Sequence, residues 1–294
     1  MDEGKMYLKD SATESDPWQP AAWQALLYPL GFYLLWSFAM NWMHVFLWDI
    51  IQPSEMAILV GNLFSVALAY LGCRLLGKAL LHSDARQMRL AWPRRGLGYF
   101  LLALVPGLVL LLFSLLAPLF IASTGYLDEY AMLLFVQGAS PLLLNIAVSI
   151  PLFLGMEFCR GFMLRGPELR WGKWPALLLV SAIFVIGAYL PYLLGYLLTE
   201  LQEAPLETLF YLASQFTFHL LLSLLAWDSA SIWPGALLYV LANAANYLPL
   251  YFMGENALFF DAATLVGGVL GIVLLTLYQR RRQEKETELP VESI

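Results

Sequence analysis

The strongest constraint on this chain is a series of eight apolar stretches, each long enough to cross a lipid bilayer as a helix. The hydrocarbon core of a bilayer is about 30 Å thick, and a helix needs about 20 mostly apolar residues to span it. The stretches cover residues 24–48, 55–76, 97–121, 140–163, 174–198, 207–226, 232–253 and 262–279. The sequence therefore predicts an all-α, polytopic membrane protein with about eight transmembrane helices.

Composition excludes an ordinary soluble domain. Hydrophobic residues make up 60% of the chain and charged residues 13%, whereas soluble domains carry about 25% charged residues. The chain therefore has too few polar side chains to cover its surface. The first 20 residues contain neither an apolar core nor a small-residue cleavage site, so we expect the first span to act as the insertion signal.

Basic residues lie in alternate connections between the predicted spans. The first, third, fifth and seventh connections contain no Lys or Arg and carry acidic residues instead. Because Lys and Arg accumulate on the cytoplasmic side of a membrane, this segregation predicts eight spans with both termini in the cytoplasm. The sixteen basic residues lie in the two tails and around the second and fourth connections: Lys5, Lys9, Arg74, Lys78, Arg86, Arg89, Arg94, Arg95, Arg160, Arg165, Arg170, Lys173, Arg280, Arg281, Arg282 and Lys285.

Ionisable or amide side chains inside apolar spans are costly, so each is a candidate for function. Glu157 and Arg160 are three residues apart and share a helix face, where they can form an ion pair. One interpretation is mutual neutralisation, with Arg160 snorkelling to the headgroups; the other is a functional site. The remaining candidates are Asn41, His44, Asn62, Asn145, Tyr189, Gln215, His219, Asn243 and Asn246.

Two of these candidate groups have simple structural interpretations. Asn243 and Asn246 share a helix face, and hydrogen bonding between helices explains such a pair as well as a site does. His219 has no second histidine within four residues, so the sequence predicts no local metal pair and favours a structural histidine.

The stretches GMEFCRGFMLRGPELRWGKWPALLLVSAIFVIGAYLP and SASIWPGALLYVLANAANYLP lie within residues 140–250. They resemble the CPBP intramembrane proteases, which comprise CAAX prenyl endopeptidases and bacteriocin-processing enzymes. Members carry EExxxR followed by Gly, then a helix similar to SALLFGLAHL, then a segment similar to GSLWPAILLHALNN. Arg160 to Phe162 resemble the family's RGF, and Ser231 to Gly235 resemble its SLWPA turn. The resemblance implies a CPBP-like core of four helices.

The reactive positions of that family hold other residues here. Alignment on Arg160 places Gly155 and Met156 where the family has two glutamates. Three further positions also differ: Tyr189 and Asn243 replace its histidines, and Tyr247 lies near its closing Asn. In the family, the glutamates and histidines bind a metal or activate water for attack on a peptide bond, and the resemblance alone implies that role.

Glu157 does not replace the missing glutamates in a regular helix. It lies one residue beyond the second glutamate position, which rotates its side chain by about 100° and shifts it by about 1.5 Å. A catalytic zinc generally needs three protein ligands, and Glu157 with His219 supplies two. Asn and Tyr side chains do not take a proton from water near neutral pH.

The leading hypothesis is therefore a catalytically inactive CPBP-like protein that binds a partner helix, peptide or lipid in the former substrate cavity. Gly155, Met156, Tyr189, His219, Asn243, Asn246 and Tyr247 would line that cavity. The enzymatic alternative is an endopeptidase that uses Glu157, oriented by Arg160 and assisted by His219, and zinc as a cofactor belongs only to this alternative. A carrier is disfavoured because the spans hold few charges near the midplane.

The resemblance also divides the chain and places it in a membrane. The predicted parts are a cytoplasmic tail (1–22), three spans with their loops (23–139), the CPBP-like core (140–253), a last span (254–282) and a disordered cytoplasmic tail (283–294). We expect a multi-pass protein of the cell (inner) membrane. Its expected partners are membrane lipids and a membrane protein or peptide. Nucleic acid is not expected because topology accounts for the basic residues.

Overall fold

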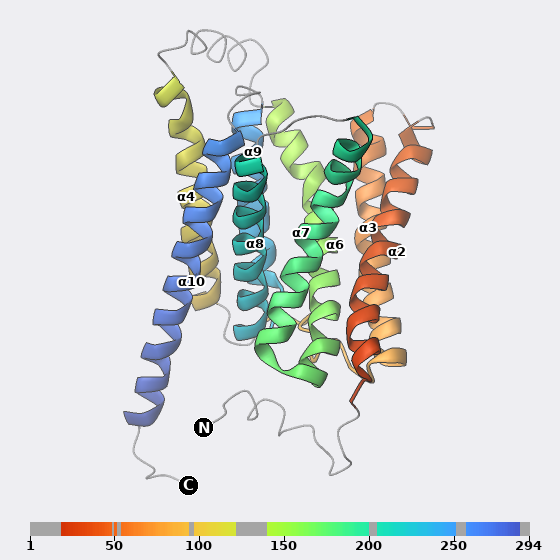
Figure 1. Cartoon of the computed structure of the whole chain (residues 1–294), viewed down its shortest axis with the longest axis vertical. Helices are drawn as coiled ribbons and strands as arrows, with labels where there is room; N and C mark the ends of the chain where they lie inside the picture. Colours follow the sequence, from red (N-terminus) through yellow and green to blue (C-terminus); the bar gives the residue numbers. More distant parts are fainter. Residues whose placement is uncertain are drawn as a thin grey trace.

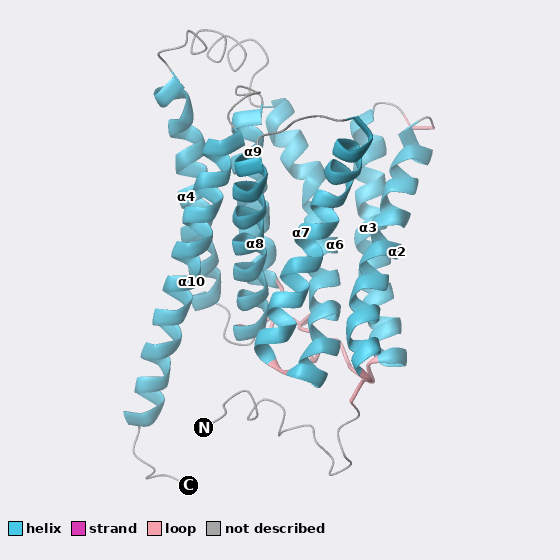
Figure 2. Cartoon of the chain, in the orientation of Figure 1, coloured by secondary structure: helices cyan, strands magenta, loops and turns pink. Residues whose placement is uncertain are grey.

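The computed structural model describes residues 19–48, 50–51, 54–93, 97–121, 140–199, 205–250 and 257–288. At positions 54–55, 115, 117–121, 140–143, 145, 188–199, 205–207, 246–250, 257–260 and 285–288 it describes the helix but not the side chains. All regular structure in these ranges is helical (Figure 2). The predicted all-α fold is thus confirmed for the described part of the chain.

The described helices follow the predicted apolar stretches closely. Their bounds are α2 (Ala22–Trp48), α3 (Ser54–Leu80), α4 (Leu97–Ile121), α6 (Ser140–Trp171), α7 (Lys173–Thr199), α8 (Pro205–Asp228), α9 (Trp233–Leu250) and α10 (Ala257–Glu288). Three of them, α3, α6 and α10, continue at least four residues past the predicted C-terminal limit of their span.

The tail prediction is wrong for residues 283–288, which belong to helix α10. This segment, QEKETE, consists largely of strong helix formers that extend an existing helix at little cost. Residues 1–18 and 289–294, which contain the rest of the two predicted tails, lie outside the described residues.

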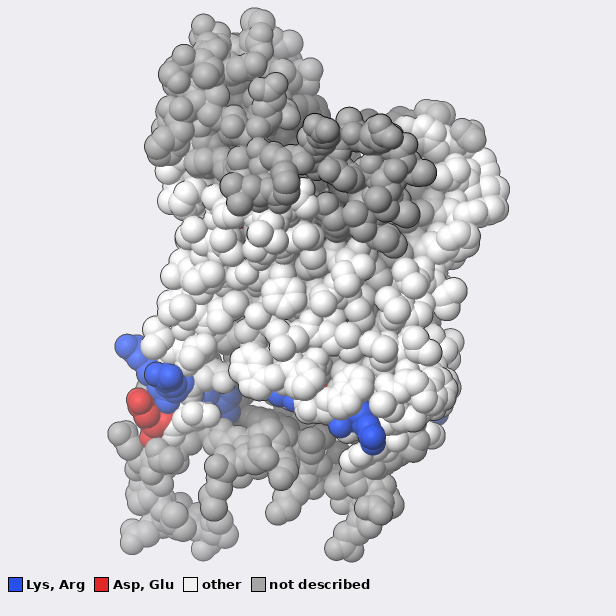
Figure 3. All heavy atoms as spheres, viewed as in Figure 1, with Lys and Arg blue, Asp and Glu red and all other residues white. Residues whose placement is uncertain are grey.

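Consecutive helices run antiparallel, so the bundle alternates up and down (Figure 1). The beginning of α2 and the end of α10 lie at the same end of the bundle, drawn at the bottom of Figure 1. The connections that follow α3, α6 and α8 lie at this end as well. Lys and Arg on the face seen in Figure 3 also gather there, whereas the middle of that face is uncharged.

Six described segments are long and apolar enough to cross a membrane: 22–48, 56–80, 97–114, 146–171, 208–228 and 261–284. In α7 the apolar segment with described side chains is shorter, Lys173–Gly187. Large apolar side chains cover the outer surface, including Leu35, Val45 and Leu75, each about 70% exposed. An apolar exterior of this kind suits lipid, and the chain is a multi-pass membrane protein. The count of eight spans stays a prediction.

Helix α6 lies at the centre of the bundle. It packs against α2 and α3 on one side and against α7 and α9 on the other. Helices α4 and α10 contact one another beyond α9 and α8. Asn62 of α3 joins α2, α3 and α6. Its Nδ2 donates to Val148 O of α6 (2.7 Å), and its Oδ1 accepts from His44 Nε2 of α2 (3.0 Å).

Glycines bring α10 close to its neighbours. A Cβ added to Gly267 would meet Leu110 of α4 at 3.4 Å, and one added to Gly271 would overlap Leu221 of α8. The two glycines therefore allow α10 to pack closely against two different helices, α4 and α8.

The connection of residues 81–93 folds against the lower end of the bundle. Met88 and Leu90 are buried, and an added Cβ on Gly161 of α6 would overlap the carbonyl oxygen of Met88. The backbone N–H of Ile232 donates to Arg89 O (2.9 Å), and Ser231 Oγ donates to Ala91 O (2.8 Å). These bonds tie the connection between α3 and α4 to the one between α8 and α9.

Candidate functional site

Glu157 and Arg160 form an ion pair in the middle of helix α6. Arg160 Nε donates to Glu157 Oε1 at 2.9 Å, and both side chains are fully buried (0% exposed). Their i, i+3 spacing places them on one helix face, so the predicted ion pair is confirmed. The interpretation in which Arg160 snorkels to the headgroups does not fit this buried, hydrogen-bonded side chain. Helix α6 continues for eleven residues beyond Arg160, to Trp171, which places its Cα about 16 Å from the helix end.

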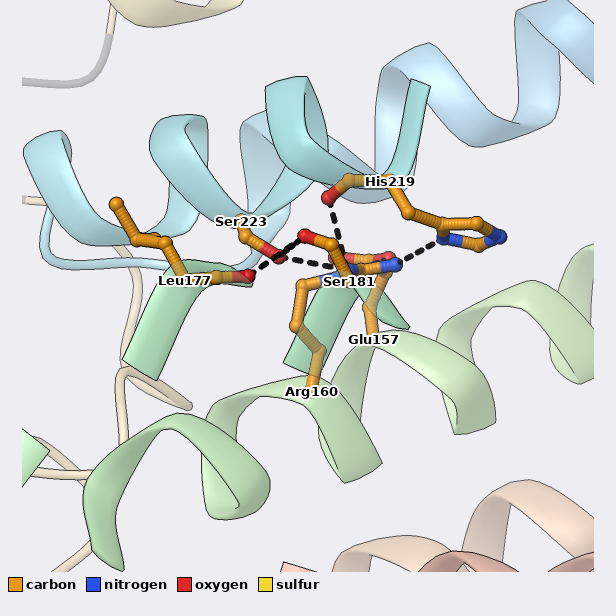
Figure 4. Close-up of polar contacts among 6 residues, drawn as sticks. All are labelled: Glu157, Arg160, Leu177, Ser181, His219 and Ser223. Carbon is orange, nitrogen blue, oxygen red and sulfur yellow. Dashed lines mark hydrogen bonds and ion pairs between the residues drawn. The ribbon is translucent and has the colours of Figure 1, made fainter. Parts of the chain in front are cut away.

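The remaining nitrogens of Arg160 bind helix α8 (Figure 4). Nη1 donates to Ser223 Oγ (2.9 Å) and to the carbonyl oxygen of His219 (3.2 Å), and Nη2 lies 2.9 Å from His219 Nδ1. On α7, the ring of Phe184 lies 4.2 Å from the guanidinium carbon, a cation–π distance. One side chain thus connects α6, α7 and α8.

These contacts fix the tautomer of His219. A guanidinium has donors only, so Nδ1 must accept from Arg160 and the ring proton of a neutral imidazole lies on Nε2. The ring stacks on Phe184, with centroids 5.0 Å apart and planes inclined by 13°, and its centroid lies 6.0 Å from that of Tyr239. The ring is buried and Nδ1 is hydrogen-bonded, as the prediction of a structural histidine requires.

The second carboxylate oxygen of Glu157 has no hydrogen-bond partner within the described residues. It lies against helix α9, where a Cβ added to Gly235 would be 2.8 Å from it. Glycine at this position allows the carboxylate to approach the α9 backbone. A buried acceptor without a partner is uncommon and costs about 1–3 kcal/mol. Oε2 is thus available to a neutral donor, such as water or an amide N–H.

The arrangement is poorly suited to proton abstraction. Arg160 binds both Glu157 Oε1 and the lone pair of His219 Nδ1, so of these two groups the carboxylate keeps Oε2 open to water. A guanidinium remains protonated at all accessible pH values, so Arg160 keeps both hydrogen bonds and does not itself take up a proton from water. Among the residues that the structure describes, no group of three His, Cys, Asp or Glu side chains is placed to hold a metal ion.

The other predicted cavity residues with described side chains lie in different surroundings. Gly155 is buried against Trp36 of α2, with the Val66 backbone of α3 nearby, on a different face of α6 from Glu157 because two residues turn a helix by about 200°. Met156 packs at the edge of the apolar core. On α9, Nδ2 of Asn243 is buried without a partner within the described residues. The side chains of Tyr189, Asn246 and Tyr247 lie outside the described residues, although their helices are described.

Sequence reasoning missed Ser181, Phe184 and Ser223. Ser181 Oγ donates to Leu177 O (2.7 Å) and lies 3.4 Å from Ser223 Oγ, which accepts from Arg160. Ser223 follows His219 by four residues and therefore shares its helix face. That spacing is the one signal in the sequence. It is weak because serine in an apolar helix usually bonds its own backbone.

No protein-family model matches the chain, no curated protein matches its sequence, and no solved structure matches its fold.

Proposed function

We propose that this chain is an eight-span protein of the cell (inner) membrane that resembles the CPBP intramembrane proteases but does not hydrolyse peptides. It binds a partner helix, peptide or lipid through the interior of its core. The motif residues from Gly155 to Pro191 and from Ser229 to Pro249 support the resemblance.

The observation that carries the inactive assignment is the sharing of Arg160 between Glu157 and His219. Oε2 of Glu157 stays open, but Glu157 Oε1 and His219 Nδ1 each share a lone pair with one permanent cation, at 2.9 Å in both cases. A general base needs that lone pair free to accept the proton of water. In the proposed inactive protein, Glu157, Arg160 and His219 stabilise the contact between α6 and α8 and do not hydrolyse peptides.

Two unpartnered polar atoms support a binding role. Glu157 Oε2 offers an acceptor, and Asn243 Nδ2 offers a donor eight residues beyond Gly235 on α9. Eight residues correspond to a rise of about 12 Å along that helix. A peptide backbone presents N–H and C=O groups in succession, so it can donate to Glu157 Oε2 and accept from Asn243 Nδ2 at separate points. A simple cation does not, because the Arg160 guanidinium lies beside the carboxylate.

The test uses purified protein with prenylated and unprenylated membrane peptides. Binding is followed by fluorescence anisotropy, and cleavage by mass spectrometry. We expect saturable binding that Asn243→Leu weakens, with the peptides recovered intact. Cleavage that Glu157→Gln abolishes would refute the inactive assignment, and the absence of binding by either peptide would refute the binding role.

The active endopeptidase is the second candidate, because Glu157 and His219 do converge on one guanidinium. In that reading Oε2 of Glu157 holds the attacking water. The Glu157→Gln variant separates the two candidates, since it keeps the shape of the site and removes only the charge and basicity of the carboxylate.

The membrane orientation is tested with added cysteines. The two native cysteines, Cys73 and Cys159, are free and buried, so a membrane-impermeant maleimide leaves them unlabelled in the folded protein. Cysteines at the exposed positions Gln19 and Arg86 report on the lower end of the bundle, and one at Ile50 reports on the upper end. With both termini in the cytoplasm, intact cells label only Ile50→Cys, and inverted vesicles label only the other two.

A further inference from the structure

A second charged cluster lies at the lower end of the bundle. It consists of Arg89 from the connection after α3, and Arg165 and Glu168 from α6. Arg89 Nη1 donates to Glu168 Oε2 at 2.9 Å, and Arg165 Nη1 lies 3.6 Å from the same oxygen. Both arginine side chains are 7% exposed, and that of Glu168 is 13% exposed. The three side chains form a recessed site that still reaches the surface.

One carboxylate does not neutralise two guanidinium groups. Together the three side chains carry a net charge of +1 and ten guanidinium N–H donors. Within the described residues, Glu168 is the one acid in an ion pair with either arginine. Asp84, the other acid whose charge acts on Arg165, is exposed, and its Oδ1 accepts from the backbone N–H of Gln87 (2.8 Å). Solvent screens such a charge more strongly than a recessed one.

The neighbouring charges do not cancel the excess. Lys173 and Asp228 pair with one another at 2.9 Å. Arg86, three residues before Arg89 on the same connection, is exposed and adds a further positive charge to that connection.

Both guanidinium groups are held in place by uncharged partners. Arg165 Nε donates to Ser83 Oγ (3.0 Å), and the guanidinium carbon of Arg89 lies 4.5 Å from the ring centroid of Trp227. The backbone of Arg89 adopts φ +63° and its carbonyl oxygen accepts from Ile232 N. A non-glycine residue in this region costs about 1 kcal/mol or more and persists where its surroundings enforce it, often at ligand-binding positions.

We propose that Arg89 and Arg165 bind a phosphate group. The planar donor edges of two arginines match phosphate oxygens, which accept paired hydrogen bonds. The site lies at the end of the bundle where the basic residues gather (Figure 3), and basic residues are typical of the cytoplasmic membrane surface. An anionic lipid headgroup and a soluble phosphate present the same chemistry. This site is separate from the Glu157 core, so it stands or falls independently of the proposed function.

The experiment measures thermal unfolding of the full chain in detergent micelles with added phosphatidylglycerol, phosphatidylcholine or inorganic phosphate. A ligand that binds only the folded state raises the midpoint with its concentration. We expect stabilisation by phosphatidylglycerol over phosphatidylcholine if the lipid is the source, and by inorganic phosphate if a soluble group is the source. Arg165→Gln and Arg89→Gln each lower the apparent affinity about tenfold, as expected from losing one charged hydrogen bond.

Glu168→Gln gives a result of opposite sign. It raises the charge of the recess from +1 to +2 and releases the arginine donors, so the affinity for phosphate increases several-fold although the unliganded protein loses stability. A purely structural network predicts the same loss of stability and no gain in ligand response. This variant also keeps the proposal testable if either arginine variant fails to fold.

Arg170→Gln is the matched control. Arg170 is an exposed residue of the last turn of α6, so its loss changes the net charge without touching the recess. An equal loss of affinity in Arg170→Gln and Arg165→Gln overturns the proposal in favour of unspecific charge attraction. A Glu168→Gln variant that responds like wild type overturns it as well, as does wild-type protein that none of the anionic ligands stabilises.

Discussion

Replacement of Arg160 by methionine is the perturbation whose cost the structure defines best. The change removes a donor to Glu157 Oε1, Ser223 Oγ and His219 Nδ1, and it leaves a fully buried carboxylate without its counter-charge. Breaking a buried ion pair by removing one partner costs about 3–5 kcal/mol. We therefore expect Arg160→Met to lower the free energy of unfolding by about that amount.

A second substitution at Glu157 separates charge from shape. The double variant Glu157→Met with Arg160→Met has no buried charge, and replacing both members of such a pair by apolar groups is often close to neutral. Here the recovery is incomplete. Ser223 Oγ keeps a contact to Ser181 at 3.4 Å, but His219 Nδ1 loses Arg160. One unsatisfied buried group costs about 1–3 kcal/mol, so we expect the double variant to lie between wild type and Arg160→Met.

The assay compares wild type, Arg160→Met, Glu157→Met and the double variant. Each is unfolded reversibly in mixed micelles of detergent and dodecyl sulfate, and unfolding is followed by far-ultraviolet circular dichroism. Arg170→Met serves as the control because its side chain is exposed on the same helix, and it should change stability by about 0.5 kcal/mol or less. A cost for Arg160→Met no greater than that of Arg170→Met would show that the guanidinium does not stabilise the bundle. A double variant less stable than Arg160→Met would show that the carboxylate is stabilising without its partner.

Three further substitutions test close contacts, and each is read from the same unfolding curves. Gly235→Ala places a methyl group 2.8 Å from the unpartnered oxygen of Glu157 and should cost about 1–3 kcal/mol; Gly31→Ala, where an added Cβ meets nothing within 4 Å, is its control, and equal effects would contradict the proposed contact. Gly271→Val overfills the contact between α10 and α8 and should also cost about 1–3 kcal/mol, so an unchanged midpoint would contradict that packing. Asn62→Leu removes two hydrogen bonds that join α2, α3 and α6 and should cost about 1–2 kcal/mol; a stabilised protein would count against them.

The location of the apolar helices along the chain was predictable from the sequence, because a bilayer accepts only apolar segments with satisfied backbone groups. The helix that begins at Ser140 was predicted to cross the membrane by residue 163, and the structure extends it to Trp171. The difference arises because hydropathy finds the apolar span, whereas a helix continues into polar residues that keep its hydrogen bonds satisfied. That difference alone explains why Arg160 was expected near the headgroups.

Lateral arrangement was not predictable in the same way. The i, i+3 spacing of Glu157 and Arg160 is local and gave the correct ion pair. The partners on α8 are 59 and 63 residues away in the sequence. Which face of α8 turns toward α6 depends on how all helices pack, and no pattern within either helix encodes it. The sequence therefore suggested His219 as a neighbour of Glu157 and Arg160 only through the family resemblance, and it did not indicate Ser223.

The two arginines of α6 show how depth in the bundle determines the role of the same side chain. Arg160 and Arg165 are five residues apart, so they point in directions about 140° apart and differ in height by about 7.5 Å. At the deeper position, neutral and acidic partners bind every nitrogen of the guanidinium, because an unpaired charge there is too costly to retain. At the shallower position, Arg165 shares one carboxylate with Arg89, and solvent or a headgroup can bind the donors that remain. A guanidinium that is bound at every nitrogen within the bundle indicates a structural cation, and incomplete neutralisation near the surface supports the proposed binding of phosphate.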